Sequence, residues 1–322
     1  MRTLSFSDGM SFYGESLKLA YSSFLRLFLA NIVLFIFLFI VIVLCALVCD
    51  TILASVMTGF DAIFLAPRYT ESIIRLVANL LESIVMFGVL NAACSQVKFD
   101  EKLRWNSFIK VFADIRFLLR IILFVILTSL FIAGMCLVGA LAIAGLGYVA
   151  NYIGVSGPLM VICGAVLFVL AFFVLLMVVA GVNLGSYCIC PKGENDGALS
   201  GLIKGVQTVE KNMSIVFTMI ALALINILIA AVFMLPVIYY IFTNVNFTGA
   251  HSQFIEDVTN SLDGAFVNSY LILLCIGVVM PFFYAVQCFW AKAGDYIYND
   301  EIPAVSNEGG AYYNYDDSNR TL

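Results

Sequence analysis

The sequence predicts an all-α, polytopic membrane protein with six transmembrane helices. Three observations predict this class: 63% of the 322 residues are apolar, only 11% are charged, and the mean hydropathy is +1.04. A soluble domain carries about 25% charged residues, so this chain has too little charge to cover a water-facing surface. The apolar excess is therefore expected to face lipid or neighbouring helices.

Six apolar runs are each long enough to cross a bilayer, which takes about 20 residues. The runs are continuous rather than alternating, and their backbone amides must be satisfied inside each segment, so they are expected to be helices and not barrel strands. We expect one membrane domain over residues 1–298 and a disordered, acidic, Tyr-rich tail over 299–322. The expected spans are 27–48, 76–97, 121–142, 159–182, 215–234 and 270–289.

The distribution of basic residues predicts the orientation. With six spans both ends share one side, and that side carries 14 of the 16 Lys and Arg residues. The opposite side carries only Arg68 and Arg75, and its loop at 245–263 is acidic without a base. The positive-inside rule then places both termini in the cytoplasm. The first apolar run is long enough to remain as an anchor in the inner, cytoplasmic membrane.

An amphipathic stretch precedes each odd-numbered span, and the three stretches align at offsets of 92 and 94 residues. We expect three tandem units, each an interfacial helix followed by a two-span hairpin, although topology alone could also demand a basic lead-in. Lys18, Lys110 and Lys204 then share one position and are expected to contact anionic headgroups. The aligned apolar positions are Tyr13, Leu17 and Ala20; Trp105, Ile109 and Phe112; and Leu199, Ile203 and Val206.

The third lead-in stretch has glycine at every fourth position, at Gly197, Gly201 and Gly205. On a helix this spacing makes a smooth stripe against which another helix can pack closely. Gly181 and Gly185 form a similar pair at the end of the fourth span. We interpret both stripes as structural.

Ionisable groups inside a span are costly and mark candidate functional positions. Glu82 is the main candidate, and Arg75, Asn79 and Glu82 have the i, i+4, i+7 spacing that puts them on one helix face. This face predicts either a polar route for a solute or lipid, or a local Arg75–Glu82 ion pair near the outer headgroups. Asn226, near the middle of the fifth span, is expected to join helices or, alternatively, to bind a substrate.

The sequence contains no recognisable catalytic, metal or cofactor motif. The nine Cys residues lie mostly in apolar runs without a CxxC pair, which is typical of small apolar side chains, and the single His251 has no ligand cluster nearby. A net charge of −5 without a long basic block argues against nucleic-acid binding. We expect a non-enzymatic protein without cofactors, whose partner is the lipid bilayer.

Three landmarks carry a family resemblance: FYGESLKLAYSSFLRLF, WNSFIKVFADIRFLLR and CPKGENDGALSGLIKGVQTVEKN. Over about residues 10–297 the chain resembles loosely related bacterial six-helix membrane proteins. These include the YciC-like proteins and the membrane domain attached to some glycerophosphodiester phosphodiesterases. The resemblance implies an envelope-homeostasis or lipid-linked role and supplies no catalytic residues. The alternative is a small-solute or lipid transporter that uses the Arg75–Asn79–Glu82 face.

Overall fold

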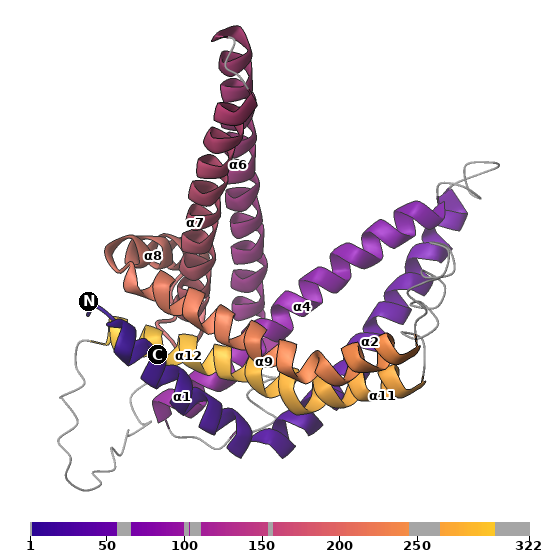
Figure 1. The fold of residues 1–322 in the computed structure, drawn as a ribbon. Helices are drawn as coiled ribbons and strands as arrows, with labels where there is room; N and C mark the ends of the chain where they lie inside the picture. Colours follow the sequence, from indigo (N-terminus) through magenta and orange to yellow (C-terminus); the bar gives the residue numbers. More distant parts are fainter. Residues whose placement is uncertain are drawn as a thin grey trace, which may run out of the picture.

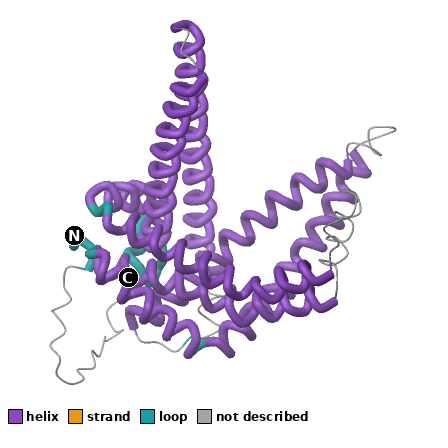
Figure 2. Tube along the Cα trace, viewed as in Figure 1, coloured by secondary structure: helices purple, strands orange, loops and turns teal. Residues whose placement is uncertain are grey.

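The computed structural model describes residues 2–56, 66–99, 103, 111–153, 157–244 and 265–299. This part of the chain is almost entirely helical and contains no strand, which confirms the all-α class (Figure 2). A π-helical turn at Cys275–Val279 joins the last two helices. The helices are α1 (Phe6–Ser22), α2 (Phe24–Val56), α4 (Ala66–Phe99), α6 (Ile115–Ile153), α7 (Gly157–Ile189), α8 (Ala198–Lys211), α9 (Ser214–Asn244), α11 (Ala265–Leu274) and α12 (Met280–Tyr298).

Five segments of the described chain are helical, long and apolar enough to cross a membrane, so this is a multi-pass integral membrane protein. They are Thr70–Phe99, Ile115–Gly145, Gly164–Ile189, Ser214–Thr243 and Val267–Tyr298. Helix α2 covers the first expected span, but its described apolar stretch, Phe39–Cys49, is shorter than a crossing. The structure thus supports five spans, and a sixth through α2 is a proposal taken up below.

The long helices diverge from a common base. Helices α2 and α4, α6 and α7, and α9 and α11 lie side by side as pairs, and the three pairs point in different directions (Figure 1). Helices α1, α8 and α12 lie at the base, where the pairs meet (Figure 1). Away from the base the side chains are largely exposed, as Leu141 and Leu228 show at 64% and 68%. Such apolar surfaces suit contact with lipid chains.

The buried core lies at the base and includes a polar network. Tyr187, Tyr284 and Phe289 are among its largest fully buried side chains. The buried Gln96 amide of α4 donates to the Ser23 hydroxyl at 3.0 Å and accepts from the Tyr284 hydroxyl at 2.7 Å. This network connects α4 to α12 and to the junction between α1 and α2. Because its members are buried, each hydrogen bond replaces one that water would otherwise make.

The first and third lead-in stretches are separate helices. Helix α1 ends at Ser22, the amide of its C-cap Ser23 donates to the carbonyls of Leu19 and Ala20, and α2 begins at Phe24. Helix α8 ends at Lys211 with Asn212 as its C-cap, and α9 begins at Ser214. Trp105, Ile109 and Lys110 of the second lead-in lie outside the described residues.

The structure changes the register that the sequence comparison assigned to α1 and α8. The helix breaks at Ser23 and Asn212 lie 189 residues apart, three more than in that comparison. At this spacing Lys18 matches Gln207, so Lys18 and Lys204 do not share a position. The sequence comparison aligned Leu199, Ile203 and Val206, whereas α8 exposes Leu199 and Ile203 and buries the face that carries Ala198, Leu202 and Gly205. The buried positions that match are Gly9 with Ala198, Tyr13 with Leu202, Ser16 with Gly205, and Ala20 with Val209.

Helices α7 and α8 pack glycine against glycine. A Cβ on Gly205 would lie 2.1 Å from the Gly181 carbonyl oxygen and 2.6 Å from the Gly185 amide nitrogen. A Cβ on Gly185 would lie 2.9 Å from the Gly201 carbonyl oxygen, whereas one on Gly197 would meet open space. Real Cβ atoms do not approach backbone atoms this closely. Each glycine stripe therefore packs closely against a helix, as its spacing predicted, and the structure shows that the two stripes meet each other, with Gly197 outside the contact.

Candidate functional site

Part of the predicted polar stripe of α4 faces α6 across a groove of about 810 Å³. We call this cavity the lateral groove. Arg75 and Asn79 line it, and Ser83 rather than Glu82 continues the polar side; Glu82 is exposed and does not line the groove. The described lining residues are Ser72, Arg75, Leu76, Asn79, Leu80 and Ser83 from α4, and Ile122, Val125, Ile126, Ser129 and Leu130 from α6.

The predicted alternative of an Arg75–Glu82 ion pair is not what the structure shows. The Arg75 guanidinium lies 2.5 Å from the Glu71 carboxylate, one turn away on the same helix. A partner at i, i+4 lies directly above on the helix surface, whereas i, i+7 is two turns away. Both side chains are well exposed, so this pair contributes little to stability. Arg75 therefore stays at the rim of the lateral groove, where its guanidinium can meet an anion.

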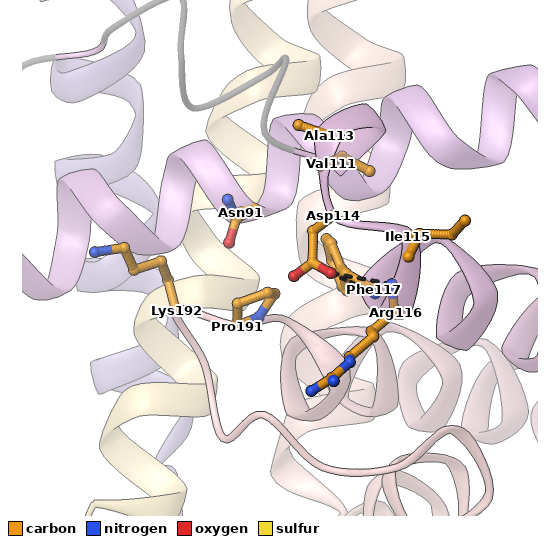
Figure 3. Close-up of a pocket in the computed structure, with 9 residues that line it drawn as sticks. All are labelled: Asn91, Val111, Ala113, Asp114, Ile115, Arg116, Phe117, Pro191 and Lys192. Atoms are coloured by element: carbon orange, nitrogen blue, oxygen red, sulfur yellow. Dashed lines mark hydrogen bonds between the residues drawn. The ribbon is translucent and has the colours of Figure 1, made fainter. Parts of the chain in front are cut away.

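A second cavity, of about 540 Å³, lies where the end of α4 meets the start of α6 and the turn after α7 (Figure 3). We call it the base pocket. It lies at the end of the helices where the Lys- and Arg-rich segments gather. Its described lining residues are Asn91, Val111, Ala113, Asp114, Ile115, Arg116, Phe117, Pro191 and Lys192.

Asn91 is the most deeply buried of the polar residues that line the base pocket. Asn91 is only 5% exposed, and its side-chain oxygen accepts no hydrogen bond from the described part of the chain. The side chain projects from α4 toward Pro191 and Asp114 (Figure 3). An unpaired buried acceptor costs about 1–3 kcal/mol. The Asn91 oxygen is therefore an acceptor in the lining of the pocket without a donor from the described chain.

Charged residues also line the pocket, and the Lys192 ammonium points away from Asn91 (Figure 3). One oxygen of Asp114 accepts from the backbone amides of Arg116 and Phe117, at 3.0 and 3.2 Å, and so caps the start of α6. The Arg116 side chain is exposed and forms no ion pair with any described residue. The Lys192 ammonium lies 4.6 Å from the centre of the Phe99 ring, at the edge of the pocket. The pocket thus combines two cations with two oxygen acceptors.

Asn226 joins two helices, which is one of its two predicted roles. Its side-chain oxygen accepts a hydrogen bond from the Tyr13 hydroxyl at 2.5 Å, and this links α9 to α1. Tyr13 is buried, so the bond lies within the packed base. The structure gives Asn226 no place in either cavity.

The lysines predicted at headgroup level have different surroundings. Lys204 donates to Asp196 at 2.8 Å and lies 4.0 Å from Glu194. The hydrogen bond to Asp196 raises the pKa of Lys204 above its ordinary value, although partial burial opposes it. Lys18 is exposed on α1, and Lys110 lies outside the described residues. Lys204 therefore pairs with acidic residues of the turn that follows α7. Contact of Lys18 with lipid headgroups stays a prediction.

The cysteines at the base behave as small apolar residues. Cys94, Cys188, Cys190 and Cys288 are all buried in the core. Burial raises the pKa of the Cys190 thiol well above its ordinary value, and a hydrogen bond with Cys94 acts in the same direction. In the described chain no group of three or more His, Cys, Asp or Glu side chains is arranged to hold a metal ion. A protonated, buried thiol is a poor nucleophile.

The fold and the two cavities define a class of protein: an all-α, multi-pass membrane protein with mainly apolar cavities between its helices that carry a few polar groups. Comparison with family models, curated proteins and solved structures gave no match to this chain. Its function is therefore inferred from the chemistry of the lateral groove and the base pocket.

Proposed function

We propose that this is a non-enzymatic membrane protein that binds a phospholipid in the lateral groove and thereby organises the surrounding bilayer. The observation that carries the proposal is the composition of the groove walls. Helix α4 contributes Arg75 and Asn79, which suit a phosphate and its polar headgroup, while α6 contributes an apolar wall that suits acyl chains. Such a role accords with the lipid-linked or envelope function that the family resemblance implies.

The proposal includes six spans in the cell membrane, with α2 as the first and both termini in the cytoplasm. The asymmetry of Lys and Arg supports this orientation. Arg75 then lies at the outer headgroup level, and α1 and α8 lie at the inner one. Single-cysteine labelling tests it: sites in 245–263 should react with an impermeant reagent outside intact cells, and sites after residue 299 should not. The reverse pattern would contradict the orientation.

Lipid retention tests the proposed function directly. We expect the protein purified in mild detergent to retain phospholipid that mass spectrometry detects. Arg75→Gln together with Asn79→Leu should reduce this retention about tenfold, because a charged and a neutral hydrogen bond are lost. Glu71→Gln is the matched control, since it removes the partner of Arg75 and leaves the cation in the groove. Equal retention in the double variant and the control would contradict the proposal.

A lipid transporter is the second candidate, and one observation favours it. Helices α4 and α6 border both cavities, and α4 carries a polar side chain in each, Ser83 in the lateral groove and Asn91 in the base pocket about two turns further along. A headgroup could follow this line while its acyl chains stay in the bilayer. Proteoliposomes with fluorescent phospholipid would test it: Ser83→Leu should slow exchange between leaflets, whereas Glu82→Gln, outside the groove, should not. Exchange no faster than in protein-free vesicles would exclude this candidate.

A further inference from the structure

We infer that the base pocket is a second binding site, for a monoanionic phosphodiester whose headgroup carries hydroxyls, as in phosphatidylglycerol. It shares no described lining residue with the lateral groove. The starting observation is Asn91, which is buried, faces the pocket and has an unpaired acceptor oxygen in the described structure (Figure 3). A buried acceptor of this kind is stabilised when a ligand supplies the missing donor.

The second acceptor is the Asp114 carboxylate. One of its oxygens is occupied by the backbone amides at the start of α6, while the other lies on the side of Asn91 and Pro191 (Figure 3). That oxygen accepts no hydrogen bond from a described residue. Two acceptors on one wall of the pocket suit a ligand with adjacent hydroxyl donors.

The charges of the residues that line the base pocket favour a phosphate group with a single negative charge. Arg116 and Lys192 line the pocket together with Asp114, so these three side chains carry a net charge of +1. A phosphodiester carries one negative charge and balances this sum. A zwitterionic headgroup leaves it unbalanced, and a dianionic monoester would be repelled by Asp114. The Arg116 guanidinium, which pairs with no acid of the described chain, also matches two phosphate oxygens in a planar arrangement.

The position of the pocket fits a lipid headgroup as the source of this chemistry. The pocket lies beside the ends of α4, α6 and α7, at the level where spans meet the basic segments. This placement at the inner headgroup level rests on the proposed membrane orientation. The chemistry of recognition rests only on Asn91, Asp114, Arg116 and Lys192.

Nanodiscs test the inference. We would reconstitute the full chain in nanodiscs of phosphatidylethanolamine with a minor fraction of phosphatidylglycerol. Native mass spectrometry then measures the ratio of the two lipids that stay bound. Asn91→Leu and Arg116→Gln should each lower the enrichment of phosphatidylglycerol about tenfold, since each removes one hydrogen bond to the ligand. Lys211→Gln, an equal loss of charge at an exposed position outside the pocket, is the control.

Folding is measured separately. In lipid-depleted detergent, Asn91→Leu should keep or raise the melting temperature, because it replaces an unpaired buried amide by an apolar group of similar size. Loss of enrichment in both variants, with the control unchanged, supports the inference. Wild-type enrichment in both, or an equal loss in Lys211→Gln, overturns it. A collapsed melting temperature in Asn91→Leu also counts against it, since the amide would then be holding the fold.

Two further arms identify the ligand source and separate this site from the lateral groove. Competition by glycerophosphoglycerol, a soluble monoanionic phosphodiester with free hydroxyls, supports the same chemistry with a soluble source, and its failure to compete assigns the lipid. In Asn79→Leu the phosphatidylglycerol enrichment should persist. If Asn79→Leu abolishes the enrichment, phosphatidylglycerol occupies the lateral groove and the inference fails while the proposed function stands. If only the base-pocket variants lose lipid, the proposed function fails and the inference stands.

Discussion

The base of the molecule and the outer halves of its long helices have similar apolar sequences but different environments. At the base, Leu184 of α7 is fully buried and Gly205 of α8 touches the backbone of α7. In the outer half of α6, Leu141 is 64% exposed and a Cβ on Gly139 would meet nothing within 4 Å. Leucine and glycine therefore act as packing residues in one region and as lipid-facing residues in the other. The comparison indicates that stability resides at the base, where close contacts replace lipid.

Glycine substitutions should give the largest difference between the two regions. Gly205→Ala should destabilise the protein by about 3 kcal/mol or more, because its Cβ would meet backbone atoms of α7 that have no flexible side chain to yield. Gly139→Ala should be neutral or stabilising by about 0.5–1 kcal/mol, since alanine favours the helix. Reversible unfolding in mixed detergent micelles would measure both. Equal effects at the two positions would show that the base is not specially packed.

Removing the amide of the buried network should have the next largest effect. Gln96→Leu leaves the hydroxyls of Ser23 and Tyr284 without this partner and should cost about 1–3 kcal/mol in the free energy of unfolding. Adding Tyr284→Phe should recover part of the loss, because it removes one unpaired group. Thr51→Val in α2 is the control, since the Thr51 hydroxyl only donates within its own helix. A simple sum of the two losses in the double variant would contradict a coupled network.

The bond between α1 and α9 should contribute less. Tyr13→Phe removes the donor to Asn226 and should lower the free energy of unfolding by about 1 kcal/mol. Tyr239→Phe, at a 73% exposed position on the outer part of α9, should change it by less than about 0.5 kcal/mol. Thermal unfolding of both variants in the same detergent is the measurement. A larger loss at Tyr239 would reverse the ranking of the two regions.

The smallest effect concerns pH and the turn after α7. The pKa of Lys204 is raised above 10.5 in the folded protein, chiefly by its hydrogen bond to Asp196. Its contribution to stability is thus fully present below about pH 10.5 and is lost as the pH rises through the raised pKa. Since the Lys204 side chain is 41% exposed and screened by water, the loss should stay below about 1 kcal/mol.

Unfolding measured between pH 9 and 12 should show this loss in the wild type. In Lys204→Gln the loss should be absent, because no ammonium is left to titrate. Lys204→Arg should hold its stability to higher pH, since a guanidinium stays charged there. If both variants lost stability with rising pH as steeply as the wild type, the loss would come from other titrating groups.

Several features of the site were predictable from the sequence, and others depended on three-dimensional neighbours. The spacing of Gly181 with Gly185, and of Gly201 with Gly205, predicted two smooth helix faces that do meet. The spacing of Arg75 and Asn79 predicted one polar face, which lines the lateral groove. Glu82 shares the nominal spacing but lies outside the groove, because the wall of the groove is set by where α6 approaches α4. The base pocket could not be predicted from the sequence, since its lining residues come from three segments that lie far apart along the chain.

The sequence by itself determined that this is an all-α, multi-pass membrane protein, because apolar runs of spanning length leave the backbone no other way to satisfy its hydrogen bonds in lipid. It also predicted a helix ahead of the first and fifth spans, and the structure has the separate helices α1 and α8 ahead of α2 and α9. Tertiary structure alone decided the register between α1 and α8, the partner of Arg75 and the unpaired amide of Asn91. Burial and pairing depend on which helices meet, and the hydropathy of a membrane helix is similar on the faces that meet protein and lipid.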